Sequence, residues 1–313
     1  LPQLPGSGII YTLTVQDARR AAEWLKQRGI AARAYHADLE AHQRIEAEQQ
    51  LLSNDVKALV ATVALGMGFD KPDLGFVVHF QRPGSVVAYY QQVGRAGRAV
   101  DSAFGILLSG REDDEIQEYF INSAFPPLEV MSGVLRVLGK AGTLTVEEIG
   151  AELNYGRGAL EKALKLLEVD GAVEHEKKGY SRTANPWQPD AARYEQVTQR
   201  RRAEVAEIKR YVEHSGCLME FLSRALDDPA AALCGKCMNC TGKTERASVP
   251  LELVQAAVDF LRHDVLVLQP RRFWPKPVLA EVHKVLPDAL ERYQNGRPKM
   301  IIPERLRAQT GRV

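Results

Sequence analysis

The stretch YYQQVGRAGR, residues 89–98, carries two arginines three residues apart, each directly after a glycine. Arg95 and Arg98 offer planar, permanently charged guanidinium groups that match the oxygens of a phosphate. Gly94 and Gly97 let the backbone approach a ligand closely. The segment therefore suits catalysis on a phosphate group. A helix end with two solvated arginines is the simpler alternative, and the rest of the chain decides between them.

Short apolar runs and amphipathic segments alternate through the first third of the chain. Apolar runs predict buried strands, and a helical spacing of apolar residues predicts the helices between them. The expected strands cover residues 8–11, 31–35, 56–62, 75–80 and 103–108. The expected helices cover residues 14–28, 40–52 and 85–93. This alternation predicts an α/β fold with a parallel, doubly wound sheet, in which ligands lie beyond the carboxyl ends of the strands.

One loop at such a strand end, ATVALGMGFDKP at residues 61–72, has more polar and glycine residues than packing requires. Gly66 and Gly68 permit close approach of the backbone to a ligand. Thr62 offers a hydroxyl at the end of a strand, and Asp70 supplies a negative charge. We expect this loop to belong to the ligand site, with an ordinary crossover between two strands as the alternative.

These segments resemble, in the same order, the second RecA-like domain of the RecQ family of DNA helicases. The resemblance covers residues 8–110, and its matching segments are residues 34–40 with Arg44, residues 61–72, FVVHF at 76–80, and residues 89–98. It implies a RecA-like parallel sheet over residues 1–124. It also implies a superfamily 2 motor that hydrolyses ATP and moves on DNA.

The resemblance assigns roles to the matching residues in three groups. The catalytic group consists of Gln91, Arg95 and Arg98. In the family, both arginines of this group face the γ-phosphate of ATP as arginine fingers. The ATP-binding group consists of Gly66, Gly68 and Asp70. The group expected to contact DNA consists of His36, Arg44 and Thr62.

An ATPase of this class also needs a glycine-rich loop that ends in Lys and Ser or Thr, and an acidic pair for Mg²⁺. Residues 242–244, Gly-Lys-Thr, have the right ending, but they lie beside a cysteine cluster and follow no apolar strand. The acidic pair Asp114 and Glu115 follows no strand either. We therefore expect ATP and Mg²⁺ to be held by a first RecA-like domain, and this chain to be inactive alone.

Residues 125–187 read as a small helical domain. Three helices are predicted by apolar residues at helical spacing, followed by two short strands around residues 177–178. Three helices and a two-stranded ribbon are typical of a winged helix, whose third helix often enters a DNA groove. The residues expected to contact DNA are Arg157, Lys177, Lys178 and Arg182. The alternative is a domain that only packs against its neighbours.

All four cysteines fall in one region, at Cys217, Cys234, Cys237 and Cys240. A compact Cys₄ set in a cytosolic protein favours structural zinc over disulfides, which are the alternative. The spacing resembles the RecQ zinc module, in which a long helix, here residues 190–215, leads into the first cysteine. We expect a helical zinc module over residues 188–245. The winged helix then precedes the zinc module, an order that suggests a divergent subgroup of the family.

Charge is distributed unevenly along the 313 residues. Residues 246–313 hold 12 Lys or Arg and 7 Asp or Glu, so this basic C-terminal region suits a polyanionic partner or a solvated surface. The sequence has no apolar run of membrane-spanning length and no leader, so we expect a cytoplasmic protein without a membrane partner. Oligomeric state is not indicated by any feature.

The resemblance implies the C-terminal part of an ATP-dependent helicase that separates strands in the 3′-to-5′ direction, with single-stranded or forked DNA as partner and a role in repair or recombination. One alternative is a non-enzymatic DNA-binding or adaptor protein that keeps a motor lobe as a scaffold. Another is a translocase on duplex DNA that does not unwind it.

Overall fold

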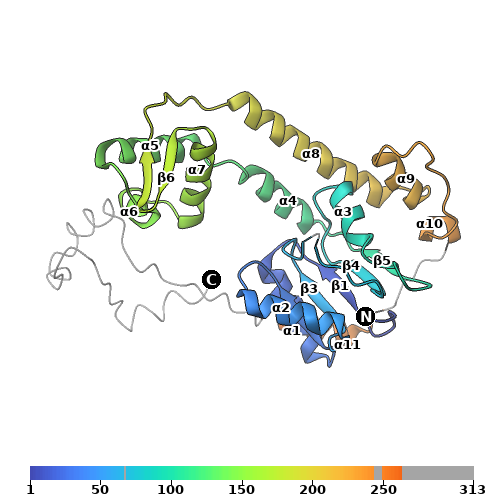
Figure 1. Ribbon diagram of the computed structural model, residues 1–313. Helices are drawn as coiled ribbons and strands as arrows, with labels where there is room; N and C mark the ends of the chain where they lie inside the picture. The colour runs from blue at the N-terminus through green and yellow to red at the C-terminus, as the bar shows by residue number, and fades with distance from the viewer. Residues whose placement is uncertain (67, 243–248, 263–313) are drawn as a thin grey trace. The chain divides into compact units, whose positions relative to one another are not determined.

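A computed structural model describes residues 1–66, 68–242 and 249–262 (Figure 1). The described residues form two compact units. Unit 1 contains residues 1–122 and the described residues from 195 onwards, and unit 2 contains residues 123–194. Most of the predicted basic region 246–313 lies outside the described residues.

Unit 1 is built on a five-stranded parallel sheet with the order β2-β3-β1-β4-β5. The strands are β1 Gly8–Tyr11, β2 Ala32–Tyr35, β3 Ala58–Ala61, β4 Phe76–His79 and β5 Phe104–Leu107. The three central strands are buried along their whole length, as expected for a parallel sheet covered on both faces. The prediction of a parallel α/β sheet is confirmed.

Helices cover both faces of this sheet because successive strand residues point to opposite sides. Ile9 packs in one apolar cluster with residues of α2, Ala41–Leu52. Its neighbour Ile10 packs in another cluster with residues of α1, Val15–Gln27. Two further helices of the unit, α3 Val86–Val93 and α4 Glu112–Asn122, follow β4 and β5 respectively.

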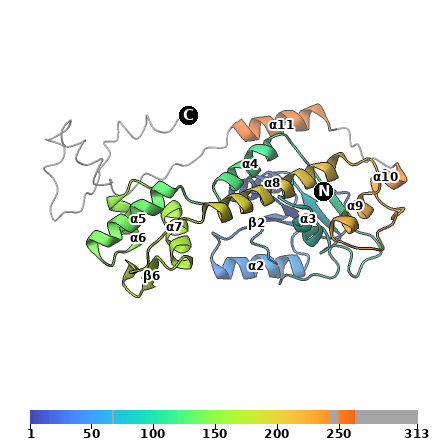
Figure 2. The same cartoon turned by 90° about the horizontal axis from the view of Figure 1, so that it is seen from above.

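The C-terminal helices of unit 1 are α8 Ala191–Glu213, α9 Leu218–Ala225, α10 Met238–Thr241 and α11 Leu251–Arg262. Of these, α8 and α9 pack against α3. Ile208 and Tyr211 of α8 join Leu222 of α9 and Val86 and Tyr89 of α3 in one buried cluster. Both views show α3, α8 and α9 side by side (Figures 1 and 2). The predicted long helix before the first cysteine is present.

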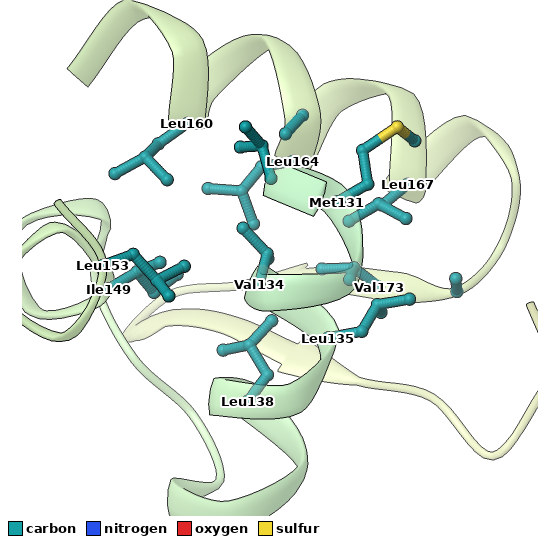
Figure 3. Packing of buried hydrophobic residues seen from close by; sticks show 13 residues of the cluster. Met131, Val134, Leu135, Leu138, Ile149, Leu153, Leu160, Leu164, Leu167 and Val173 are labelled. Carbon is teal, nitrogen blue, oxygen red and sulfur yellow. The ribbon is translucent and has the colours of Figure 1, made fainter. Parts of the chain in front are cut away.

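Unit 2 has the elements of a winged helix in the predicted order. They are α5 Leu128–Ala141, α6 Val146–Glu152, α7 Arg157–Val169, β6 Val173–Glu176 and β7 Gly179–Arg182. A bridge between Leu144 and Tyr180 joins the segment before α6 to the hairpin. Figure 3 shows Met131, Leu164 and Leu167 among the side chains that fill the space between α5 and α7. α6 begins at a capping box in which Thr145 and Glu148 satisfy each other's backbone N–H groups.

Within the described residues, no helix is both long and apolar enough to cross a membrane.

We expect Leu164→Ala to lower the free energy of unfolding of unit 2 by about 3 kcal/mol, because Leu164 is fully buried and truncation leaves a cavity. The control Val169→Ala, also on α7, truncates an exposed side chain and should change the free energy of unfolding by less than about 0.5 kcal/mol. Urea titration of both variants measures the difference. Equal midpoints for the two variants would contradict the packing in Figure 3.

Candidate functional site

Arg95 anchors the loop that follows β3. Its side chain is buried, and its guanidinium donates from Nη1 to the Phe69 carbonyl at 2.7 Å and from Nη2 to the Gly66 carbonyl at 3.1 Å. Hydrogen bonds from a charged group are stronger than neutral ones, so this contact fixes the loop against the end of α3. The two stretches singled out in the sequence therefore form one site at the carboxyl edge of the sheet.

Arg98 occupies a different environment three residues further on. Its guanidinium pairs with the Asp70 carboxylate at 2.8 Å, and about half of each side chain is exposed. An exposed ion pair contributes only about 0–1 kcal/mol, so another anion can displace the carboxylate at little cost. Arg98 is thus the more exposed and more weakly held arginine of the pair.

Among the residues that the structure describes, none explains why the loop has glycine at these two positions. Gly66 and Gly68 are exposed, and neither has a left-handed backbone. A Cβ atom built on Gly68 would meet nothing within 4 Å, and one on Gly66 would meet only the Ala64 carbonyl at 3.9 Å. The open space beside these glycines is therefore available to a ligand that approaches the backbone.

The remaining residues predicted for this site are distributed between the surface and the interior. Gln91 is exposed on α3. His36 is buried, and its Nε2 lies 3.0 Å from Nε of Arg19, which donates to it. Thr62 is buried, and its hydroxyl accepts the Ala64 N–H at 3.3 Å. Arg44 is partly buried, and its Nε has no partner among the described residues. The expected DNA contacts of His36, Thr62 and Arg44 stay predictions, and so does the catalytic role expected for Gln91.

His79, at the end of β4, is a buried residue of this site that sequence reasoning missed. Its Nε2 lies 2.8 Å from Oε1 of Gln92, and its ring stacks on Tyr11 with the centroids 5.4 Å apart. Burial lowers the pKa of His79 to about 4, so the ring is neutral at physiological pH. Gln92 Oε1 can only accept, so it fixes the tautomer with the proton on Nε2. The sequence feature that could have indicated a buried, functional His79 was its position at the end of an apolar strand.

A second missed group connects α4 to α8. Arg82 is buried and pairs with Asp114, and its backbone N–H donates to Asp113 at 3.0 Å. Lys209 of α8 pairs with the same Asp114 at 2.8 Å. Asp114, at the start of α4, therefore bridges one cation from the sheet edge and one from α8.

The four cysteines form a compact cluster at one end of unit 1. Their Sγ atoms all lie within 4.8 Å of one another, and all four are free thiols. Tetrahedral zinc with Zn–S bonds of about 2.3 Å would need sulfur atoms about 3.8 Å apart, so the cluster fits this ion after small adjustments. Gly235 adopts the left-handed conformation expected of a tight turn between two ligands.

Backbone N–H groups surround the sulfur atoms. Cys217 Sγ accepts from Glu220 and Cys234, and Cys237 Sγ accepts from Leu218 at 3.4 Å. Burial raises the pKa of the Cys237 thiol, but these N–H groups and the neighbouring cysteines lower it to about 6. Thiolate is the form that binds a metal, so the surroundings of Cys237 favour the state that zinc needs. Hydrogen bonds with Cys237 and Cys217 instead raise the pKa of the Cys240 thiol to about 12.

In unit 2, the residues predicted to contact DNA are only partly available. Arg157, the first residue of α7, pairs with Glu147 and with Glu161. Lys177 and Lys178 are exposed at the hairpin turn. Arg182 points toward α5, where its Nη1 lies 3.4 Å from the Leu135 carbonyl.

Residues 3–100 match the family model described as the helicase conserved C-terminal domain. The chain is 33% identical over 259 residues to the ATP-dependent DNA helicase RecQ of Synechocystis sp., covering 77% of this chain and 50% of that protein. It is 46% identical over 98 residues to RecQ of Pasteurella multocida, covering 31% and 16% respectively. The probable ATP-dependent DNA helicase RecS of Bacillus subtilis is 39% identical over 139 residues, covering 44% and 28%. The chain thus spans at most about half the length of these curated relatives.

Among solved structures, the chain is similar to the Escherichia coli DEAD-box protein SrmB bound to the regulator of ribonuclease activity A. The match has 27% sequence identity and a TM-score of 0.34, and it covers 37% of this chain and 69% of that one.

We expect acidification to destabilise unit 1 through His79. The folded state holds this ring neutral down to about pH 4, whereas the unfolded chain protonates it near pH 6.5. The stabilisation is therefore complete above about pH 6.5 and is lost as the pH falls toward 4, by about 2 kcal/mol at about pH 5. The control His79→Asn cannot titrate, so urea unfolding at neutral and acid pH should show a shallower pH dependence for it. The same pH dependence in both proteins would contradict this account.

Proposed function

Because the chain belongs to the RecQ family of superfamily 2 helicases, we propose that it forms the second motor lobe and the DNA-binding and metal-binding parts of an ATP-dependent DNA helicase. The observation that carries this proposal is the division between its two arginines. Arg95 is buried and fixes the loop that bears Gly66 and Gly68, while Arg98 stands exposed beside that loop. Catalysis of phosphoryl transfer rests on positioning and on stabilisation of the developing charge, and one positioning and one exposed cation can supply both.

In this mechanism ATP and Mg²⁺ are held by a first RecA-like domain outside these 313 residues, and the chain does not hydrolyse ATP alone. When the lobes close, Arg98 leaves Asp70 and donates to the γ-phosphate oxygens. There it stabilises the charge that develops as the phosphoryl group transfers to water. Asp70 thus holds the arginine near its working position when no nucleotide is present.

Arg95 couples this event to DNA. Because it binds the carbonyls of Gly66 and Phe69, any movement of the arginine segment also moves the loop that begins at Thr62. That loop starts at the carboxyl edge of the sheet, where we propose that the motor contacts the DNA backbone. Unwinding in the 3′-to-5′ direction on forked DNA, with a role in repair or recombination, is the activity proposed for the whole enzyme.

We propose zinc for the four-cysteine cluster, as a structural ion held by Cys217, Cys234, Cys237 and Cys240. Four protein ligands leave no open position for a substrate, so the ion contributes folding energy and not catalysis. Cys217 lies between α8 and α9 and the other three cysteines follow α9, and buried residues of both helices pack on α3. The metal therefore supports the helix that leads into the arginine segment.

Arg98→Ala, made in the enzyme that contains both motor lobes, should reduce kcat for DNA-stimulated ATP hydrolysis by roughly 10³-fold or more. Affinity for single-stranded DNA should change little, because Arg98 is assigned to ATP. The matched control is Arg28→Ala, an exposed arginine at the far end of α1. A variant that keeps more than about a tenth of wild-type turnover would remove Arg98 from the catalytic group.

Folded chain should contain one equivalent of zinc by metal analysis. Removal of the ion with a chelator should increase hydrogen exchange in α9 and α10 and loosen the contact of Leu222 with α3, because metal binding here is folding energy. Exchange in α7, which belongs to unit 2, serves as the internal control. Metal content well below one equivalent, or unchanged exchange in α9 after chelation, would contradict a structural zinc site.

A further inference from the structure

Unit 2 contains an open hollow of about 420 Å³ that the predicted DNA contacts of α7 do not explain. It lies along α5 and includes the end of the hairpin and the segment that follows it. The side chains that matter are Ser132, Arg136, Gly139, Lys140, Arg182 and Trp187. None of its lining residues comes from α7.

The sequence of α5 places cations on the face opposite the core. Ser132, Arg136 and Lys140 follow one another at intervals of four residues, so they share one side of the helix. Met131 and Leu138, by contrast, are buried in the apolar core of the unit (Figure 3). The hollow is therefore bordered by a polar, cationic stripe of the helix.

Arg182 reaches this stripe from β7. Its Nη1 lies 3.4 Å from the Leu135 carbonyl, and a Cβ atom on Gly139 would lie 3.2 Å from the same nitrogen. Glycine in the interior of a helix is destabilising, so its presence needs a cause. Here the missing side chain makes room for the guanidinium over the helix backbone.

The charge of the hollow is not neutralised. No carboxylate lines it, and within the described part of the chain Arg136 and Lys140 form no ion pair. On α7 the situation is the reverse, because Arg157 is held by Glu147 and Glu161. An anion approaching unit 2 therefore meets more free positive charge at the hollow than at the first turn of α7.

Trp187 supplies a fixed aromatic surface at the same place. Its ring packs against the core of the unit, and its Nε1 donates to Asp170 at 3.1 Å. Packing and this hydrogen bond hold the ring in position and satisfy its polar edge. The part of the ring that lines the hollow can then stack on a flat apolar ligand.

We propose that this hollow binds single-stranded DNA, with Arg136, Lys140 and Arg182 on the phosphates and one base stacked on Trp187. Cations that follow a backbone beside an aromatic platform are the general means of holding a single strand. A base in a duplex is already stacked on its neighbours, so an aromatic platform of this kind favours an unpaired strand. The inference rests on the proposed function, since it supplies a binding site for the strand that the motor acts on.

The test is the affinity of the 313-residue chain for a fluorescent oligothymidine strand, measured by anisotropy at several salt concentrations. Arg136→Ala combined with Lys140→Ala should weaken binding roughly tenfold or more. It should also make the dependence of log K on log salt shallower by about 1.4, at about 0.7 for each lost phosphate contact. The control, Lys162→Ala with Lys165→Ala, removes two exposed cations from α7 and should keep nearly wild-type affinity and slope.

Trp187 is tested by two substitutions with the same probe. Trp187→Phe keeps an aromatic ring and should stay within about twofold of wild type, whereas Trp187→Leu should lose roughly tenfold. Thermal melting followed by circular dichroism checks that each variant is folded, and the surface variants of α5 test the site independently of the core.

The inference is overturned if the α5 double variant binds the strand with wild-type affinity and slope. It is also overturned if the α7 control loses as much affinity as the α5 double variant. Those results would leave the proposed function standing, because the wild-type chain would still bind the strand. A wild-type chain that does not bind the strand at all would overturn the DNA-binding part of the proposed function together with this site.

Discussion

The buried guanidinium of Arg95 is the contact on which the site depends. Its bonds to the Gly66 and Phe69 carbonyls connect two segments that are 26 to 29 residues apart in the chain. Each hydrogen bond from a charged group contributes roughly 1.5–3 kcal/mol when the partner groups are otherwise dehydrated. With Arg95 fixed in this way, the loop glycines and Arg98 are held at one edge of the sheet, and only Arg98 keeps its freedom to move.

The helix that leads into the two arginines, α3, is supported by α8 and α9. Tyr89 of α3 packs against Tyr211 of α8 with ring centroids 5.2 Å apart, and Leu222 of α9 completes the cluster. Cys217 caps the N-terminus of α9, so the cysteine cluster lies directly beside a helix that packs in the same apolar cluster as Tyr89. A metal site far from the chemistry in sequence can therefore affect how firmly α3 is held.

Much of unit 1 could be predicted from the sequence because local patterns specify it. Buried runs such as Val77 and Val78 indicate strands, and the spacing of the cysteines indicates one cluster. The different roles of Arg95 and Arg98 could not be predicted, because both follow a glycine and only tertiary packing buries one of them. The contact of His79 with Gln92 and the hollow beside Arg182 were missed for the same reason, since each joins residues that are distant in sequence.

A structure of the complete enzyme bound to a non-hydrolysable ATP analogue tests the central claim, that the two arginines divide positioning from catalysis. We expect the Arg98 guanidinium to have left Asp70 and to lie within hydrogen-bond distance of the γ-phosphate. We also expect Arg95 to remain on the carbonyls of Gly66 and Phe69. The opposite arrangement, with Arg95 on the phosphate and Arg98 still paired with Asp70, would contradict the account.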